Sequence, residues 1–266
     1  MLAVEFAQRS DPGRVRENNE DYLGAVVPSG ERQARSHGWL FVLADGVGGQ
    51  QCGEVAARVA VESMLAGFRV ARAGEPLATL LARLVETAND KVLEAGMHAS
   101  PGGVSMATTI VACALRFDRA VIAHAGDSRC YLVRKGHARA LTRDHTVANE
   151  QLRLGILSVR EAARADARRV LTRSLGTGMS VHVEISEHRV YTDDVLLLCS
   201  DGLHGAVDDS DLARLVTPSR DLDFAVRDLV AMAFNRDGSD NISVIAARVK
   251  GVEQVGMYRG RPYKLR

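Results

Sequence analysis

The sequence predicts a single α+β domain, and three observations lead to this fold class. Short apolar runs bounded by turn residues occur in two groups along the chain, a pattern typical of β-strands. Longer segments with helical periodicity come in pairs after each group. The 266 residues show no internal repeat and no linker-like stretch, so one large core can form. Two groups of strands with helix pairs between them are the simplest layout.

The N-terminal third begins with strands. Residues 2–8 alternate weakly and predict a strand, which a turn over 10–13 ends. The charged octapeptide 14–21 follows, and by itself it is typical of a solvated loop. A strand is expected over 22–27 and a buried one over 39–45, where the apolar run stops at Asp45. Gly48 and Gly49 then let the backbone approach a ligand closely.

The rest of the chain follows the same logic. Amphipathic helices are expected over 54–68 and 76–97, and an antiparallel meander of four strands over 108–141. The polar, arginine-rich stretch 146–174 is long enough to be a flap. Strands over 181–185, 187–191 and 195–199, helices over 208–216 and 222–234, and a last strand ending near residue 250 complete a domain of residues 1–250. We expect residues 251–266 to be a basic tail.

Composition excludes several classes of protein. The formal net charge of +1 argues against a protein that neutralises nucleic-acid phosphates. No run approaches the roughly 20 apolar residues that span a bilayer, and the first residues do not resemble a signal peptide. The four cysteines lie mostly beside apolar residues and form no CxxC pair, which favours free thiols in a reducing compartment. We expect a cytoplasmic monomer.

Acidic residues stand at the ends of four expected strands. Asp45, Asp127 and Asp201 each follow an apolar run, and Asp240 precedes one. Any one of these acids is typical of an ordinary turn. Four of them, together with the acids of the octapeptide, predict a shared site. Because clustered carboxylates repel one another, such a site requires raised pKa values or metal ions.

The expected ligands are all oxygen atoms, from the side chains of Glu20, Asp45, Asp127, Asp201 and Asp240 and the carbonyl of Gly46. Such ligands favour Mg²⁺ or Mn²⁺. Two such ions lower the pKa of a shared water molecule and make hydroxide available near neutral pH. Arg16 offers a planar fork of donors to a phosphoryl group, so hydrolysis of a phosphate monoester is the expected reaction.

Seven ordered motifs carry a resemblance to a known family: Arg16-Glu-Asn-Asn-Glu-Asp21, Leu43-Ala-Asp-Gly-Val-Gly-Gly49, Met106-Ala-Thr-Thr109, His124-Ala-Gly-Asp-Ser-Arg129, Thr142-Arg-Asp-His-Thr146, Cys199-Ser-Asp-Gly-Leu203 and Gly238-Ser-Asp-Asn-Ile242. Over residues 4–250 the chain resembles the metal-dependent protein phosphatases, the PPM or type 2C family, in its bacterial serine/threonine branch. The resemblance implies an αββα sandwich, in which two packed antiparallel sheets are flanked by helices.

The resemblance also implies a role for each matching residue. Asp45 would bridge two ions, the Gly46 carbonyl would serve the second, and Asp201 and Asp240 would complete the first. Glu20 would serve the second ion directly or through water, supported by Asp21, and Asn241 would be a further supporting residue behind the ligands. Asp127 and Asp201 would hold a weaker third ion. Arg16 would bind substrate phosphate, and a hydroxide bridging the metals would attack phosphorus.

Several positions depart from the family pattern or stay open. Val47 stands where some members have a histidine thought to act as general acid. His204 is nearby in sequence, but an ordinary surface histidine is the simpler interpretation, and His124 is expected in the core. Ala107 replaces a frequent glycine, which concerns packing. The flap arginines either contact acidic or phosphorylated segments or form a solvated helix face.

The sequence therefore predicts a protein phosphatase for phosphoserine and phosphothreonine that reverses a bacterial-type serine/threonine kinase. Two alternatives remain. One is a dedicated phosphatase of a single regulatory phosphoprotein, of the anti-sigma-factor antagonist type. The other is an inactive family member that acts as a binding module, which the complete set of acids disfavours.

Overall fold

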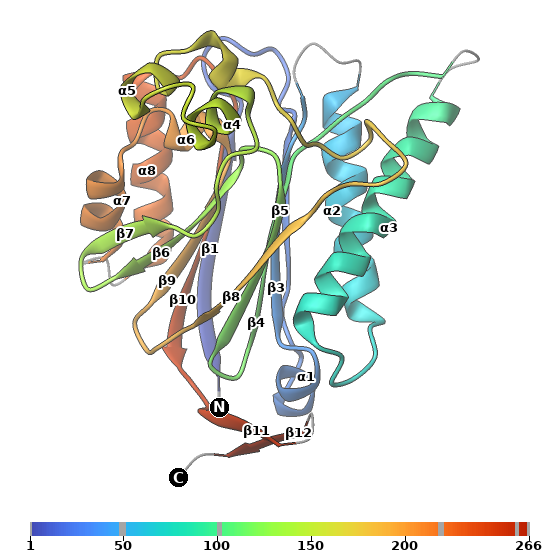
Figure 1. The fold of residues 1–266 in the computed structure, drawn as a ribbon. Coiled ribbons are helices and arrows are strands. Elements are labelled where there is room, and N and C mark those ends of the chain that lie inside the picture. Colours follow the sequence, from blue (N-terminus) through green and yellow to red (C-terminus); the bar gives the residue numbers. More distant parts are fainter. Residues whose placement is uncertain (1, 48–51, 100–102, 218–220, 259–260, 265–266) are drawn as a thin grey trace.

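Two antiparallel sheets pack face to face at the centre of the molecule (Figure 1). The structure is a computed structural model that describes residues 2–47, 52–99, 103–217, 221–258 and 261–264. The first sheet contains, in spatial order, β1 (Ala3–Asp11), β10 (Ile242–Gly251), β9 (Val195–Cys199), β6 (Arg129–Arg134) and β7 (His137–Ala140). The second contains β2 (Asp21–Val26), β3 (Trp39–Asp45), β4 (Ile110–Arg116), β5 (Arg119–Ala125) and β8 (Glu184–Arg189).

Helices cover the outer face of each sheet. The long helices α2 (Gly53–Arg69) and α3 (Leu77–His98) lie against the second sheet, and α7 (Asp209–Val216) and α8 (Leu222–Arg236) lie against the first (Figure 1). The short helix α1 (Glu31–Ser36) precedes β3. This arrangement confirms the predicted αββα sandwich.

Strand β3 shows why the sequence forms this layered core. Its residues alternate between two clusters: Leu40 and Val42 pack with the helices α2 and α3, whereas Phe41 and Leu43 pack between the sheets. Because successive side chains of a strand point to opposite faces, a strand covered on both sides must be apolar at nearly every position. The uninterrupted apolar run that ends at Asp45 is therefore the signature of a central strand.

The expected meander over 108–141 is wrong in one respect. Strands β4 and β5 form a hairpin in the second sheet and β6 and β7 form one in the first, so the chain crosses between sheets at residues 126–128. Gly126 makes this crossing with a φ of +116°, and a Cβ there would lie 2.6 Å from the Cβ of Thr109. Only glycine combines this conformation with such close packing.

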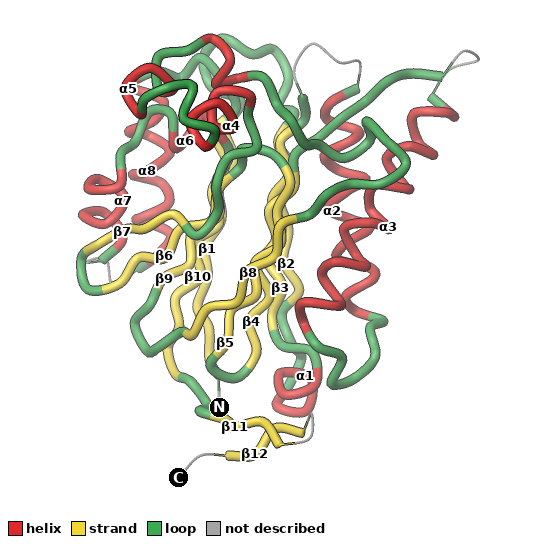
Figure 2. The backbone as a smooth tube through the Cα atoms, in the orientation of Figure 1, coloured by secondary structure: helices red, strands yellow, loops and turns green. Residues whose placement is uncertain are grey.

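Two other segments differ from expectation. The strands predicted over 181–185 and 187–191 are one strand, β8, which starts at Glu184 and ends at Arg189. The expected tail contains a hairpin of β11 (Val255–Tyr258) and β12 (Arg261–Lys264), which lies at the bottom of Figure 2 near α1. Its four-residue strands pair only with each other, and the alternation is too short to detect in the sequence.

Replacing Phe41 by alanine should destabilise the sandwich. Its ring, fully buried on β3, lies 5.3 Å from that of Phe6 on β1 and so joins the two sheets. Loss of a buried phenylalanine leaves a cavity and costs about 3–5 kcal/mol of unfolding free energy. Urea unfolding followed by circular dichroism measures this change. Phe224→Ala on α8, whose ring is half exposed, is the control and should cost less than about 1 kcal/mol. Equal losses in the two variants would contradict the proposed role of Phe41.

Candidate active site

The register of the strands brings the acidic residues to one end of the sandwich. In the second sheet Asp21 pairs directly with Asp45, so the start of β2 lies beside the end of β3. In the first sheet Val244 pairs with Cys199, so the start of β10 lies beside the end of β9. Antiparallel neighbours that start and end together deliver residues distant in sequence to a common edge.

A cleft of about 590 Å³ opens at this edge, and we call it the acid cleft. Its lining includes Arg16, Asp45, Gly46, Asp127, Asp201 and Asp240. These are six of the seven residues that the sequence analysis assigned to metal or phosphate. Val47, Thr109 and the segment from Arg169 to Leu171 also line it. Gly48 and Gly49 lie outside the described residues.

The seventh residue, Glu20, lies beside Gly46 behind the cleft. Its carbonyl accepts a hydrogen bond of 3.0 Å from the amide of Gly46. A Cβ built on Gly53, the first residue of α2, would lie 3.1 Å from Oε1 of Glu20. A Cβ on Gly46 would lie 2.5 Å from the backbone of Gly53. Glycines at both positions therefore bring the Glu20 carboxylate close to the cleft.

Several carboxylates at the acid cleft have raised pKa values. Burial, followed by the neighbouring carboxylates, raises the pKa of Asp127 to about 7 and that of Asp201 to about 6. The same causes raise the pKa of Asp45 well above its usual range, and burial raises that of Glu20. Each group resists ionisation because its neighbours are also acids in a site of low polarity.

Arg16 is a cation in direct contact with one of these acids. Its Nη2 donates a 2.9 Å hydrogen bond to Oδ2 of Asp240, and this contact is the main cause of its raised pKa. Arg16 comes from the charged octapeptide, which in this fold lies against the β10 end of the cleft rather than in solvent alone. A guanidinium has five N–H donors, so pairing with one carboxylate leaves others for an anion.

Hydrogen bonds from buried neighbours hold Asp45. The backbone amide of Asp45 donates to Oγ1 of Thr109 at 3.0 Å, and Oγ1 of Thr108 donates to the carbonyl of Asp45 at 2.9 Å. The Thr109 hydroxyl also contacts that of Ser128 at 2.8 Å. Both threonines belong to a motif recognised in the sequence, but no pattern within the sequence indicated that they position Asp45.

Asn241 and Asp21 fill the space behind the cleft. The Oδ1 of Asn241 accepts from the amide of Glu20 at 2.8 Å, and its Nδ2 donates to the carbonyls of Pro12 and Asn18. Asp21 accepts from the hydroxyl of Ser200 at 2.8 Å through Oδ2, while its Oδ1 has no hydrogen-bond partner. Burial raises the pKa of Asp21 to about 7.

The donor set fits divalent cations. Four carboxylates line one cleft, a fifth lies behind it, and a buried carboxylate oxygen of Asp21 is unpartnered nearby. Cations placed among these oxygens would offset the burial and the repulsion that raise the pKa values of Asp45, Asp127 and Asp201. Oxygen donors without a thiolate or imidazole suit Mg²⁺ or Mn²⁺.

The two positions that departed from the family pattern are now placed. Val47 lines the acid cleft, and the described residues of its lining include no histidine. His204 is half-buried rather than an ordinary surface residue: its Nε2 donates to the carbonyl of Asp127 at 3.0 Å, and burial lowers its pKa to about 4. The helix α6 (Asp201–His204), too short to detect by periodicity, turns this ring inward.

The predicted flap consists of α4 (Val147–Arg153), α5 (Val159–Ala162) and the 3₁₀ turn over Asp166–Arg169. It lies at the acid end of the sandwich beside α6 (Figure 1). A second groove of about 450 Å³ separates the flap from α6 and shares Arg169 and three of the aspartates with the acid cleft. The flap segment thus borders the site that its sequence position suggested.

The chain belongs to the protein phosphatase 2C family, whose model matches residues 14–234. Membership of this family identifies the chain as a phosphatase. It is similar to the serine/threonine phosphatase Stp of Listeria innocua, with 33% identity over 264 residues that cover 98% of this chain and 99% of the relative.

Two solved structures resemble the fold closely. The Streptococcus agalactiae serine/threonine phosphatase has a TM-score of 0.84 and 32% identity, and covers 93% of this chain and 100% of its own. The catalytic domain of PstP, solved in complex with two manganese ions, has a TM-score of 0.76 and 30% identity, and covers 94% and 99%. Across the described ranges, none of the helices of the present chain has the length and apolarity needed to traverse a membrane.

The raised pKa of Asp21 predicts a pH-dependent gain in stability for Asp21→Asn in protein treated with EDTA. The folded pKa of about 7 exceeds the unfolded value of about 3.9, so the wild-type protein loses stability as pH rises through this window. Asparagine does not ionise. The variant should gain roughly 2–4 kcal/mol near pH 8 and almost nothing near pH 4.

Thermal and urea unfolding across this range measure the gain. Asp90→Asn makes the same change at an exposed position of α3 and serves as the control. A gain that is equal at both ends of the pH range would show that charge on Asp21 is not its cause.

Proposed function

We propose that this chain hydrolyses phosphoserine and phosphothreonine monoesters on proteins with the aid of Mg²⁺ or Mn²⁺. The observation that carries the proposal is the meeting of Arg16 with Asp45, Asp127, Asp201 and Asp240 in one cleft. Carboxylates at this density attract divalent cations, and a guanidinium beside them gives a phosphoryl group its second anchor. Phosphoric monoesters hydrolyse extremely slowly without a catalyst, so this concentration of charge is needed.

The proposed ligands follow the residues of the cleft. Asp45 would bridge two ions, Asp201 and Asp240 would serve the first, and Glu20 with the Gly46 carbonyl would serve the second. A third, weaker site would use Asp127 and Asp201. Bound ions of this kind lower the pKa of coordinated water and so supply hydroxide near neutral pH. The related PstP structure contains two manganese ions, which supports the two main ion sites proposed here.

The chain's own groups orient the substrate and the acids. Arg16 would hold two phosphoryl oxygens with its planar fork, and its present partner, Asp240, fixes where that fork lies. Thr108 and Thr109 hold the backbone of Asp45 on both sides, and Asn241 holds the amide of Glu20. These bonds keep the carboxylates in place although they repel one another, which is the preorganisation that electrostatic catalysis requires.

The proton for the leaving group comes from solvent in this proposal. Val47 offers none, and the Nε2 proton of His204 is donated to the carbonyl of Asp127. The described lining of the acid cleft contains no histidine, its arginines do not lose protons near neutral pH, and its aspartates would be deprotonated as ligands of the ions.

We further propose that the substrates are targets of a bacterial-type serine/threonine kinase. The bacterial relatives are named as serine/threonine or protein phosphatases, which supports phosphoprotein substrates. A cytoplasmic, monomeric enzyme stays an expectation from the sequence. No observation favours a dedicated phosphatase of a single regulatory phosphoprotein over a broader enzyme. A binding module without activity is disfavoured because four of the expected acids line the acid cleft and Glu20 lies behind it.

Phosphate release from a phosphothreonine peptide tests the reaction. We expect turnover with Mn²⁺ and none after chelation with EDTA. Asp45→Asn and Asp240→Asn should each lower kcat by at least about 10³-fold, because each removes a charge that the ions require. Unchanged circular dichroism would show that the fold is retained, and Asp90→Asn is the matched control. Turnover that survives EDTA, or that either variant retains, would refute the metal assignment.

Arg16→Gln should weaken substrate binding in the ground state and in the transition state. Loss of a charged hydrogen-bond donor costs about 1.5–3 kcal/mol, so kcat/KM should fall about 10- to 150-fold. Steady-state kinetics on the same peptide measure this loss. Arg9→Gln removes the same charge from an exposed position on β1 and should leave kcat/KM unchanged. An equal effect of both variants would point to net charge rather than to a contact with phosphate.

A further inference from the structure

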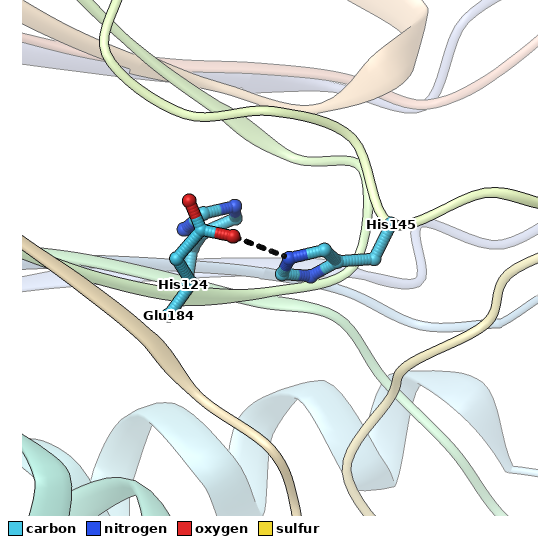
Figure 3. Close-up of side chains that lie close together, drawn as sticks. All are labelled: His124, His145 and Glu184. Atoms are coloured by element: carbon cyan, nitrogen blue, oxygen red, sulfur yellow. Dashed lines mark hydrogen bonds and ion pairs between the residues drawn. The ribbon is translucent and has the colours of Figure 1, made fainter. Parts of the chain in front are cut away.

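His124, His145 and Glu184 form a polar cluster (Figure 3), which contacts the flap through Arg173. Their potential ligand atoms all lie within 4.8 Å of one another. His124 comes from β5 and Glu184 from β8, whereas His145 comes from the loop before α4. The dashed line in Figure 3 joins the Glu184 carboxylate to the His145 ring, at 3.2 Å.

The bonding within this cluster argues against a metal ion. The two imidazole rings are stacked, with centroids 4.5 Å apart and planes only 9° apart, so their lone pairs cannot aim at one point. Nε2 of His124 donates to the carbonyl of Arg143 at 3.0 Å. The guanidinium of Arg173 lies 3.0 Å from Nε2 of His145 and would repel a cation.

The tautomer of His145 follows from its neighbours. The amide of Gly126 donates to Nδ1 at 3.2 Å, so Nδ1 carries no proton. The proton of the neutral ring is then on Nε2, where it is donated to Oε2 of Glu184. Burial, with His124 and Arg173 beside it, lowers the pKa of His145 to about 4, which keeps the ring neutral. Arg173 therefore faces another donor and gains no hydrogen bond from His145.

This leaves the Arg173 guanidinium with weak partners. Within the described part of the chain no carboxylate lies within 4.0 Å of it, and its other hydrogen bond, to the carbonyl of His182, is 3.4 Å long. Arg173 lines a pocket of about 550 Å³ together with Arg143, Glu150, Arg153 and Thr172, and we call this the arginine pocket. A half-buried cation with poor partners binds an anion more strongly than a fully solvated cation does.

The charges around the arginine pocket do not balance. Arg153 pairs with Glu150 at 2.8 Å, and Arg143 reaches Glu184 at 3.5 Å. Three guanidiniums therefore face two carboxylates, and His145 adds no charge. Planar guanidiniums match the paired oxygens of a phosphoryl group, and Thr172, a residue of the lining, has a hydroxyl that can donate.

We propose that the arginine pocket binds a phosphoryl group other than the one hydrolysed in the acid cleft. The link to the acid cleft is the flap segment 169–174, because Arg169, Val170, Leu171 and Ser174 line the acid cleft while Thr172 and Arg173 line the arginine pocket. The group comes either from free inorganic phosphate, the product of the reaction, or from a second phosphorylated residue of the substrate. The second source rests on the proposed function.

Direct binding tests the pocket independently of catalysis. The full chain is titrated with inorganic phosphate in EDTA, and ³¹P line broadening is recorded. Without cations, the four carboxylates that line the acid cleft outnumber Arg16 and Arg169 and repel phosphate there. We expect saturable binding that weakens at least about fivefold in Arg173→Gln and in Arg153→Gln. Arg164→Gln removes a flap arginine that lines neither the arginine pocket nor the acid cleft, and this variant should bind phosphate as the wild type does. No saturable binding, or equal binding in all variants, would overturn the proposal.

Kinetics then distinguish the two sources. With Mn²⁺ present, kcat/KM is compared for peptides with one phosphothreonine and for a series with a second phosphorylated residue at increasing spacing. If the substrate supplies the group, one spacing should be preferred, and Arg173→Gln should abolish the preference while Arg164→Gln keeps it. If binding is confirmed and no spacing is preferred, free phosphate is the ligand. Absence of turnover on every peptide would refute the proposed function but leave the binding result intact.

Discussion

The mutual repulsion of carboxylates at one end of the sandwich is the constraint on which the rest of the structure depends. Burial and neighbouring carboxylates raise the pKa values of Asp45, Asp127 and Asp201, so these acids do not draw one another together. The apolar core between the sheets does so instead, because Phe41 and Leu43 on β3 and Leu196 and Leu198 on β9 bury one face of each strand. Hydrophobic packing thus holds the charges in place for a cation to bind.

The sequence predicted those parts of the fold that a single periodicity determines. The strand at 39–45, the helices α2 and α3 and the acids at strand ends each leave a local pattern. The assignment of each strand to one of the two sheets leaves no local pattern in the sequence. Residues 126–128 look like a turn in either case, and only the packing of Gly126 against Thr109 sends the chain into the other sheet. Helix α6 escaped prediction because four residues span barely one helical turn.

The candidate site divides in the same way. Acid residues at the ends of apolar runs were found from the sequence, because strand ends are where polar side chains leave the core. The groups that support them were not, since they are single contacts between distant segments: Thr109 reaches Asp45, and Asn241 reaches Glu20. The inward ring of His204 and the pairing of His145 with Gly126 likewise depend on loops whose course only the folded chain defines.

The C-terminal end of the flap, residues 171–175, is hydrogen-bonded to the segments that form the site. Leu175 exchanges two backbone hydrogen bonds with Thr108. Thr108 and its neighbour Thr109 are the residues that hydrogen-bond the backbone of Asp45. Thr172 donates its amide to the carbonyl of His145, whose own amide is donated to the carbonyl of Gly126, next to Asp127. Residues 171–175 are therefore positioned by the same strand ends that position the acids. Any group recognised by this segment is held in a defined place relative to the acid cleft, whatever motion the outer helix α5 has.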